Sequence, residues 1–129
     1  MRLSKKNKTL KILFVASEAS PFVKVGGLGE VMYSLPKALR ELGHDVRVMI
    51  PKYSTIDSAK FSMSMIEESL FVPIGENAGG PEGHMICNVK KFLDPDNGQA
   101  VTYLLENEEY YEQRGSVYGY DNDPTRWAL

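Results

Sequence analysis

An apolar run, a helical stripe and a second apolar run follow one another near the start of the chain. Residues 10–16 are almost continuously hydrophobic, as in a parallel-sheet strand that is covered on both faces. Val46, Val48 and Ile50 alternate with polar residues before Pro51, which predicts a second strand. Between the two, apolar residues recur at intervals of three or four: Leu28, Val31, Met32, Leu35, Ala38, Leu39 and Leu42. This order predicts a right-handed βαβ unit.

The expected helix contains a proline and is followed by a glycine. Pro36 removes the hydrogen bond to the carbonyl of Met32, which normally kinks a helix at a cost of about 3 kcal/mol. Because the apolar stripe continues in phase across Pro36, we expect one bent helix rather than two. Gly43 lies where a C-terminal cap belongs, so we expect the helix to end just before it.

The second half of the chain has a different pattern. Strand-like runs cover residues 68–75, 84–93 and 100–106, and the segments between them are rich in turn-forming residues. We therefore expect hairpin-like connections between consecutive strands. Asp123 and Pro124 predict the start of a helix near the last residue, which indicates a polypeptide that stops within an element.

Composition limits the class of protein. The 129 residues, 43% hydrophobic and 25% charged, are typical of one soluble globular domain after a basic tail at residues 1–9. A net charge of −2 argues against nucleic acid as a partner. No apolar run approaches the roughly 18 residues of a membrane span. The single cysteine, Cys87, excludes an internal disulfide and indicates a reducing compartment, either the cytoplasm or, in a plant or alga, the plastid. We expect no metal site, since only two histidines are present and no C-x-x-C pair.

Lys24, Gly26 and Gly27 lie where the first expected strand passes into the helix. Ligands of open α/β sheets bind at this carboxyl end of a strand, and a helix N-terminus offers unpaired N–H groups with about half a positive charge. Glycine lets an anion approach those groups, and Lys24 adds a full charge, which favours phosphate or pyrophosphate as the ligand. The alternative is a tight turn with Lys24 in solvent. The segment matches neither the P-loop nor the G-x-G-x-x-G pattern.

The surrounding residues form a more specific pattern. Lys24–Leu28 fill a Lys-x-Gly-Gly-Leu motif, with Glu18 and Pro21 upstream and Gly43–His44 downstream. This pattern resembles the N-terminus of bacterial glycogen synthases and plant starch synthases. A second similarity lies in the segment YLLENEEYYEQRGSVYGYDNDPTRWAL, so the resemblance extends over residues 10–129.

The resemblance implies a fold and a reaction. Enzymes of this family have the GT-B fold, in which two Rossmann-like domains enclose a cleft. They transfer glucose from ADP-glucose to the non-reducing end of an α-1,4-glucan, with retention of configuration and without a metal or cofactor. The family's lysine and glycines line the donor site near the phosphates. This nominates Lys24, Gly26 and Gly27 for binding ADP-glucose, with Leu28 as packing, and leaves the catalytic residues unassigned. Position 30 holds Glu30, where the family commonly has Asp.

The resemblance also implies that the chain is one part of such an enzyme. We expect residues 10–129 to form a partial starch synthase catalytic domain of the α/β class. Its Rossmann-like, mostly parallel sheet with a hairpin-like insertion is an incomplete N-terminal domain of a GT-B fold. The C-terminal GT-B domain is then a missing partner, and the 129 residues alone are expected to be inactive, because half a cleft cannot align donor and acceptor. A non-catalytic phosphate- or glucan-binding remnant is the alternative.

Other residues receive structural interpretations. We expect Cys87 to be a small buried apolar group within a strand and His44 to cap the helix rather than to catalyse. An aromatic group near the end of the chain forms either a sugar-stacking surface or a packing surface; it comprises Tyr110, Tyr111, Tyr118, Tyr120 and Trp127.

Overall fold

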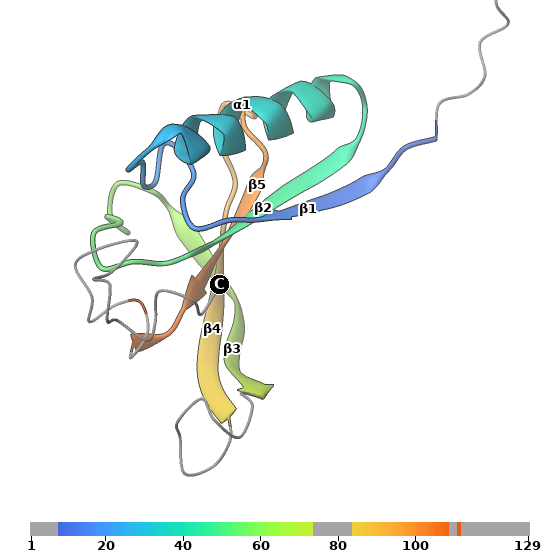
Figure 1. Ribbon diagram of the computed structural model, residues 1–129. Helices are drawn as coiled ribbons and strands as arrows, with labels where there is room; N and C mark the ends of the chain where they lie inside the picture. The colour runs from blue at the N-terminus through green and yellow to red at the C-terminus, as the bar shows by residue number, and fades with distance from the viewer. Residues whose placement is uncertain (1–7, 74–83, 109–110, 112–129) are drawn as a thin grey trace, which may run out of the picture.

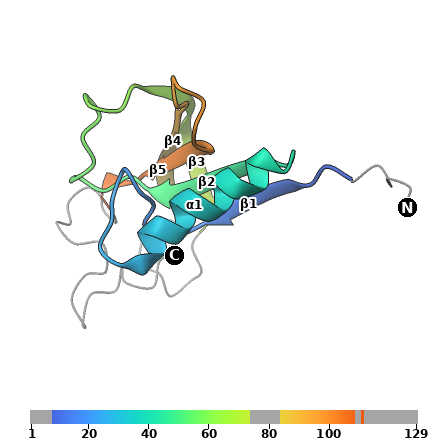
Figure 2. The same ribbon diagram turned by 90° about the horizontal axis from the view of Figure 1, so that it is seen from above.

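The computed structural model describes residues 8–73, 84–108 and 111 of the chain. Its elements in chain order are β1 (Lys11–Val15), α1 (Gly27–Glu41), β2 (Asp45–Pro51), β3 (Met63–Pro73), β4 (His84–Phe92) and β5 (Val101–Glu106). The strands form one sheet in the order β1-β2-β5-β4-β3. Figure 1 shows α1 lying along one face of this sheet, and the view from above in Figure 2 places it over β1 and β2.

The sheet combines a parallel part with an antiparallel extension. β1 pairs with β2, and β2 with β5, in parallel, whereas β4 pairs antiparallel with both β5 and β3. In Figure 1 the β3–β4 ribbon extends away from the part of the sheet that α1 covers. The α/β class, the βαβ unit and the hairpin-like insertion are confirmed. The sheet is mixed rather than mostly parallel, because the insertion contributes half of the strand pairings.

α1 begins and ends close to the predicted positions. It is one helix through the buried Pro36, as expected. Gly43 has a φ of +96°, and its N–H bonds the carbonyl of Arg40 at 2.9 Å, which confirms the cap. His44 Nδ1 accepts the N–H of Leu10 at 3.1 Å. The ring of His44 thereby ties the segment after the helix to the start of β1.

One face of β1 is open, contrary to the prediction that both faces are covered. Leu13 is 54% exposed and Val15 is 60% exposed. They alternate with the partly buried Ile12 and Phe14, and Phe14 packs on the core. Among the described residues, β1 pairs only with β2, and α1 lies over one face alone (Figure 1). Within the described residues, the apolar side chains of β1 are therefore partly buried on one face and exposed on the other.

β3 begins at Met63, earlier than the predicted start at residue 68. Its first half, residues 63–67, mixes apolar and polar side chains that are all exposed except the half-buried Met63, so these side chains are not sorted into a buried and an exposed face. It is held by backbone pairing with β4 instead, with register shifts between Met65 and Glu67 and between Glu67 and Leu70.

The core lies between α1, the sheet and the loops. Ile50 and Leu104 are fully buried at neighbouring positions of β2 and β5. Phe22, from the loop after β1, packs against Phe61 with ring centroids 4.7 Å apart and against Phe92 at 5.1 Å. The β1–α1 loop is thus anchored in the core by an aromatic side chain, and this anchor fixes the loop that carries Lys24.

Candidate functional site

The loop between β1 and α1 folds back onto the first turn of the helix. Ser20 N–H bonds the carbonyl of Gly29 at 3.0 Å, and Val23 N–H bonds the carbonyl of Ala19 at 3.1 Å. Tyr53, just after β2, donates its hydroxyl to the carbonyl of Ser17 at 2.7 Å. These bonds hold the loop at the carboxyl ends of β1 and β2, where α/β sheets bind their ligands.

Glu18 occupies the inner side of the helix N-terminus. Its side chain is fully buried, and its carboxylate accepts the N–H groups of Val25, Gly26 and Gly29, the last two at 3.1 and 3.0 Å. The N-cap residue Gly26 has no side-chain cap of its own. Glu18 therefore supplies the negative charge and the acceptor atoms that the start of α1 needs.

Gly27 lies on the outer side of the same helix end. It is exposed, and a Cβ built on it would meet nothing within 4 Å. Its N–H belongs to the first turn, where N–H groups have no partner within the helix. Within the described parts of the chain, no acceptor bonds this N–H. Gly27 therefore offers a bare amide to solvent.

Lys24 lies three residues before Gly27, at the same end of α1. Its Nζ lies 2.7 Å from Oε1 of Glu30, and both side chains are about half exposed, at 50% and 55%. An ion pair this exposed contributes about 0–1 kcal/mol. The side chain of Lys24 is therefore free to exchange Glu30 for another anion at little cost.

Gly29 explains why the lysine lies so close to the helix. A Cβ at this position would lie 3.1 Å from Cγ and 3.3 Å from Cα of Lys24. The missing side chain lets the helix pack directly against the backbone of the lysine. Lys24, Gly26 and Gly27 all lie at the start of α1, and their binding of ADP-glucose stays a prediction. One part of the expectation needs correction, because the amide of Gly26 faces the carboxylate of Glu18 and not solvent.

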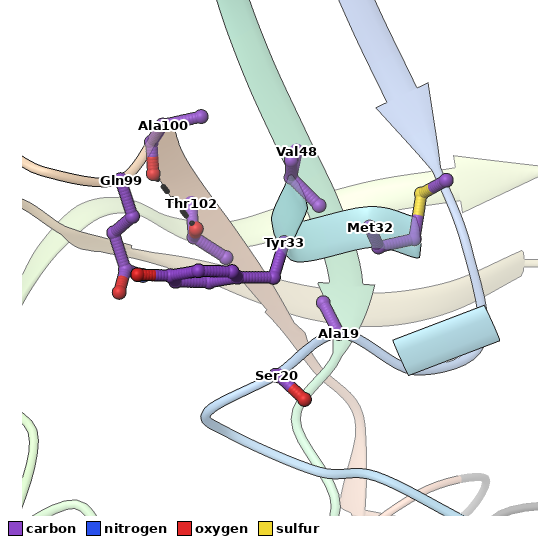
Figure 3. A pocket seen from close by; sticks show the side chains of 8 residues that line it. All are labelled: Ala19, Ser20, Met32, Tyr33, Val48, Gln99, Ala100 and Thr102. Atoms are coloured by element: carbon purple, nitrogen blue, oxygen red, sulfur yellow. Dashed lines mark hydrogen bonds between the residues drawn. The ribbon is translucent and has the colours of Figure 1, made fainter. Parts of the chain in front are cut away.

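A small pocket lies on the other side of the loop (Figure 3). Side chains from α1, β2, β5 and the loops surround it: Ala19, Ser20, Met32, Tyr33, Val48, Gln99, Ala100 and Thr102. None of the three predicted binding residues lines this pocket. The candidate phosphate site is therefore separate from this pocket, and its residues Lys24, Gly26 and Gly27 are exposed.

The comparisons with known proteins bear on this corner. The sequence model of the starch synthase catalytic domain family matches residues 11–129. The chain belongs to this family. Similar relatives include the glycogen synthase of Clostridium perfringens, which is 37% identical over 95% of this chain. The glycogen synthase of Clostridium acetobutylicum is 42% identical over 92% of it.

The starch synthase family match covers only a part of each relative. The aligned region is 23% of both clostridial glycogen synthases. A solved structure, the catalytic domain of starch synthase IV from Arabidopsis thaliana bound to ADP and acarbose, covers 92% of this chain and 23% of its own, with a TM-score of 0.72 and 23% identity. This likeness shows that the two chains share a fold.

Two functional features of this starch synthase family chain escaped sequence reasoning. Glu18 was recognised as part of the motif, but its pairing with amides seven to eleven residues downstream depends on the path of the loop. Gly29 resembled any helix-opening glycine. The position of the Glu-x-x-Pro segment directly after a strand could have suggested that Glu18 is buried. It could not have identified the N–H groups that the carboxylate of Glu18 bonds.

The remaining interpretations have clear outcomes where the structure describes the residues. Cys87 is 1% exposed, and burial raises the pKa of its thiol, as expected for a buried apolar group. Tyr111 is buried and packs edge-to-face on Tyr53, with centroids 6.1 Å apart, so it belongs to the packing surface. The other aromatic residues of that group, together with Asp123 and Pro124, lie outside the described residues.

Two further findings concern the described residues only. The described residues contain no group of three or more potential metal-ligating side chains. They also contain no helix long and apolar enough to cross a membrane.

Proposed function

We propose that this chain supplies the donor-phosphate corner of a glucosyltransferase. The reaction is transfer of glucose from ADP-glucose to the non-reducing end of an α-1,4-glucan, with retention and without a metal. The observation that carries the proposal is the exposed Lys24 beside the bare amide of Gly27, at the N-terminus of α1. Membership of the starch synthase catalytic domain family supports the choice of reaction.

The corner suits the chemistry of a departing nucleoside diphosphate. When the bond to glucose breaks, negative charge grows on the diphosphate. An ammonium, an oriented N–H group and the positive end of a helix stabilise that charge without reorganising. The diphosphate would replace Glu30 as the partner of Lys24. Gly26 contributes its backbone position, since its N–H is already bonded to Glu18.

The other ligand contacts are assigned to polypeptide beyond the matched region. The aligned segment is 23% of the clostridial glycogen synthases, and we propose that a C-terminal GT-B domain holds most of the nucleotide. The Arabidopsis starch synthase IV structure is bound to ADP and acarbose. This supports ADP as the diphosphate carrier, with a glucan as the acceptor.

A second candidate is phosphate or glucan binding without transfer. The short aligned share, 23% of each relative, favours it for these 129 residues by themselves. Robust incorporation of labelled glucose into glycogen by the purified 129-residue chain would exclude this candidate. ADP or glucan binding without incorporation would support it.

The substitution Lys24→Ala, made in the complete protein that the gene encodes, tests the proposed function. We expect kcat/KM for ADP-glucose to fall about 100-fold, because one charge that stabilises the transition state is lost. The melting temperature should shift by less than about 2 °C, since the Lys24–Glu30 pair is exposed. Labelled-glucose kinetics beside a thermal melt measure both.

The matched control is Lys37→Ala, which removes the same charge from the middle of α1. Lys37 lies near the ring of Tyr33, away from the loop, and its replacement should leave kcat/KM within about twofold. Equal losses in the two variants would contradict a specific role for Lys24.

A further inference from the structure

Glu18 has a role in this corner that goes beyond capping a helix. We propose that Glu18 is a positioning residue, whose buried carboxylate holds Lys24 in place. It also bonds some N–H groups of the helix N-terminus and leaves the others for the ligand. The inference rests on the proposed function, because it specifies how the donor-phosphate corner is built.

A fully buried carboxylate must be compensated. Moving an ionised group out of water costs several kcal/mol unless hydrogen bonds and opposite charge replace the water. Here the compensation comes from three backbone N–H groups and the helix dipole, since Glu18 accepts from Val25, Gly26 and Gly29. The interaction is mutual, so the loop is fixed as firmly as the carboxylate.

The three donors are the groups that determine where Lys24 lies. Val25 and Gly26 directly follow the lysine in the chain, and Gly29 packs against its Cα and Cγ. Glu18 therefore bonds both the backbone that follows Lys24, at Val25 and Gly26, and the backbone of Gly29, against which Lys24 packs. Within residues 8–73, 84–108 and 111, the ammonium itself is held only by the exposed pair with Glu30. Glu18 thus fixes the base of the side chain and leaves its tip mobile.

The same bonds decide which amides a ligand meets. Gly26 is the N-cap of α1, so the first three helical residues are Gly27, Leu28 and Gly29. Glu18 takes the N–H groups of Gly26 and Gly29. No acceptor in the described part of the chain bonds the N–H groups of Gly27 and Leu28, both exposed residues, so they remain for an anion. A buried negative charge behind them also repels an anion that would bind deeper, which directs the diphosphate to the side of Lys24.

A double-mutant cycle tests this assignment in the polypeptide as its gene encodes it. Glu18→Gln keeps the shape but turns an NH₂ group toward one of the backbone donors. We expect kcat for glucose transfer to fall about tenfold, because the base of Lys24 shifts. KM for the glucan acceptor should stay unchanged. In the Lys24→Ala background, Glu18→Gln should change kcat by less than about twofold.

The cycle separates two kinds of failure. If Lys24→Ala has no effect on transfer, the proposed function fails. If Lys24→Ala has its effect but Glu18→Gln lowers kcat equally in both backgrounds, Glu18 acts independently of Lys24 and this inference is overturned. Glu41→Gln, an exposed acid at the end of α1, is the matched control and should behave as the unchanged protein does.

Amide hydrogen exchange keeps the inference testable if the variant does not fold. In the unchanged protein, the amides of Val25, Gly26 and Gly29 should exchange slowly without ligand. Those of Gly27 and Leu28 should exchange fast and become protected when ADP is added. Fast exchange at Val25 and Gly26 without ADP, or ADP protection confined to those two amides, would overturn the assignment.

Discussion

The glycines of the β1–α1 loop contribute to one corner in different ways. Gly27 leaves open space in front of an amide, and Gly29 lets the helix touch the backbone of Lys24. At Gly26 an added Cβ would lie 3.6 Å from Glu18 Oε1, an ordinary contact. The motif predicted which residues gather here. It did not predict the role of each one, because those roles depend on the direction in which each amide points.

Gly29→Ala and Gly26→Ala form a matched pair that tests these roles. The Cβ at position 29 would lie 3.1 Å from Cγ of Lys24, so the lysine must move by a few tenths of an ångström. We expect kcat/KM to fall about tenfold. The free energy of unfolding should change by less than about 1 kcal/mol, because alanine improves helix propensity by up to about that amount.

For Gly26→Ala we expect kcat/KM within about threefold of the unchanged protein, because no close contact is created. Steady-state kinetics and urea unfolding of both variants measure the difference. A larger kinetic loss at position 26 than at position 29 would contradict the packing argument for Lys24.

Among the elements, α1 and β2 were the most predictable. Their apolar positions follow the helical and strand periods, and Gly43 marks the helix end with a φ of +96°. β3 was predicted only in part. Its first half mixes apolar and polar residues that are nearly all exposed, and it pairs through the backbone across two register shifts. Periodicity cannot detect a strand whose side chains are not sorted by burial.

Gly43→Ala tests the cap of α1. A side chain at a positive φ costs about 1–2 kcal/mol, and an added Cβ at Gly43 meets no neighbour within 4 Å, so strain is the main term. We expect the free energy of unfolding to fall by about 1 kcal/mol. Ser34→Ala, an exposed position within α1, is the control and should change it by less than about 0.5 kcal/mol. Equal, small changes at both positions in urea unfolding would contradict the assigned role of Gly43.

At the scale of the whole molecule, the described residues leave the parallel strands with one covered and one open face. α1 covers one face (Figure 2). On the other, Leu13 and Val15 of β1 are more than half exposed. Sequence analysis predicted two covered faces because the apolar run of β1 requires partners for both. Within the described residues only one face of β1 is covered, so this prediction is not borne out there.

Changing the open face should have different effects in the 129 residues alone and in any polypeptide whose further residues cover this face. In the 129 residues expressed alone, Leu13→Thr with Val15→Thr should reduce self-association, because exposed apolar patches drive it. In a longer gene product that covers this face, the same pair should destabilise the fold by about 2–4 kcal/mol. Light scattering and urea unfolding measure the two effects. Unchanged self-association of the short chain would contradict the interpretation of this face.

The structure of the polypeptide with ADP bound decides whether the corner at Lys24 holds the donor diphosphate. We expect phosphate oxygens within hydrogen-bond distance of the Gly27 N–H, with Lys24 Nζ moved from Glu30 to the diphosphate and Glu18 still bonded to Gly26 and Gly29. A diphosphate bound elsewhere, with Lys24 still paired to Glu30, would contradict this account.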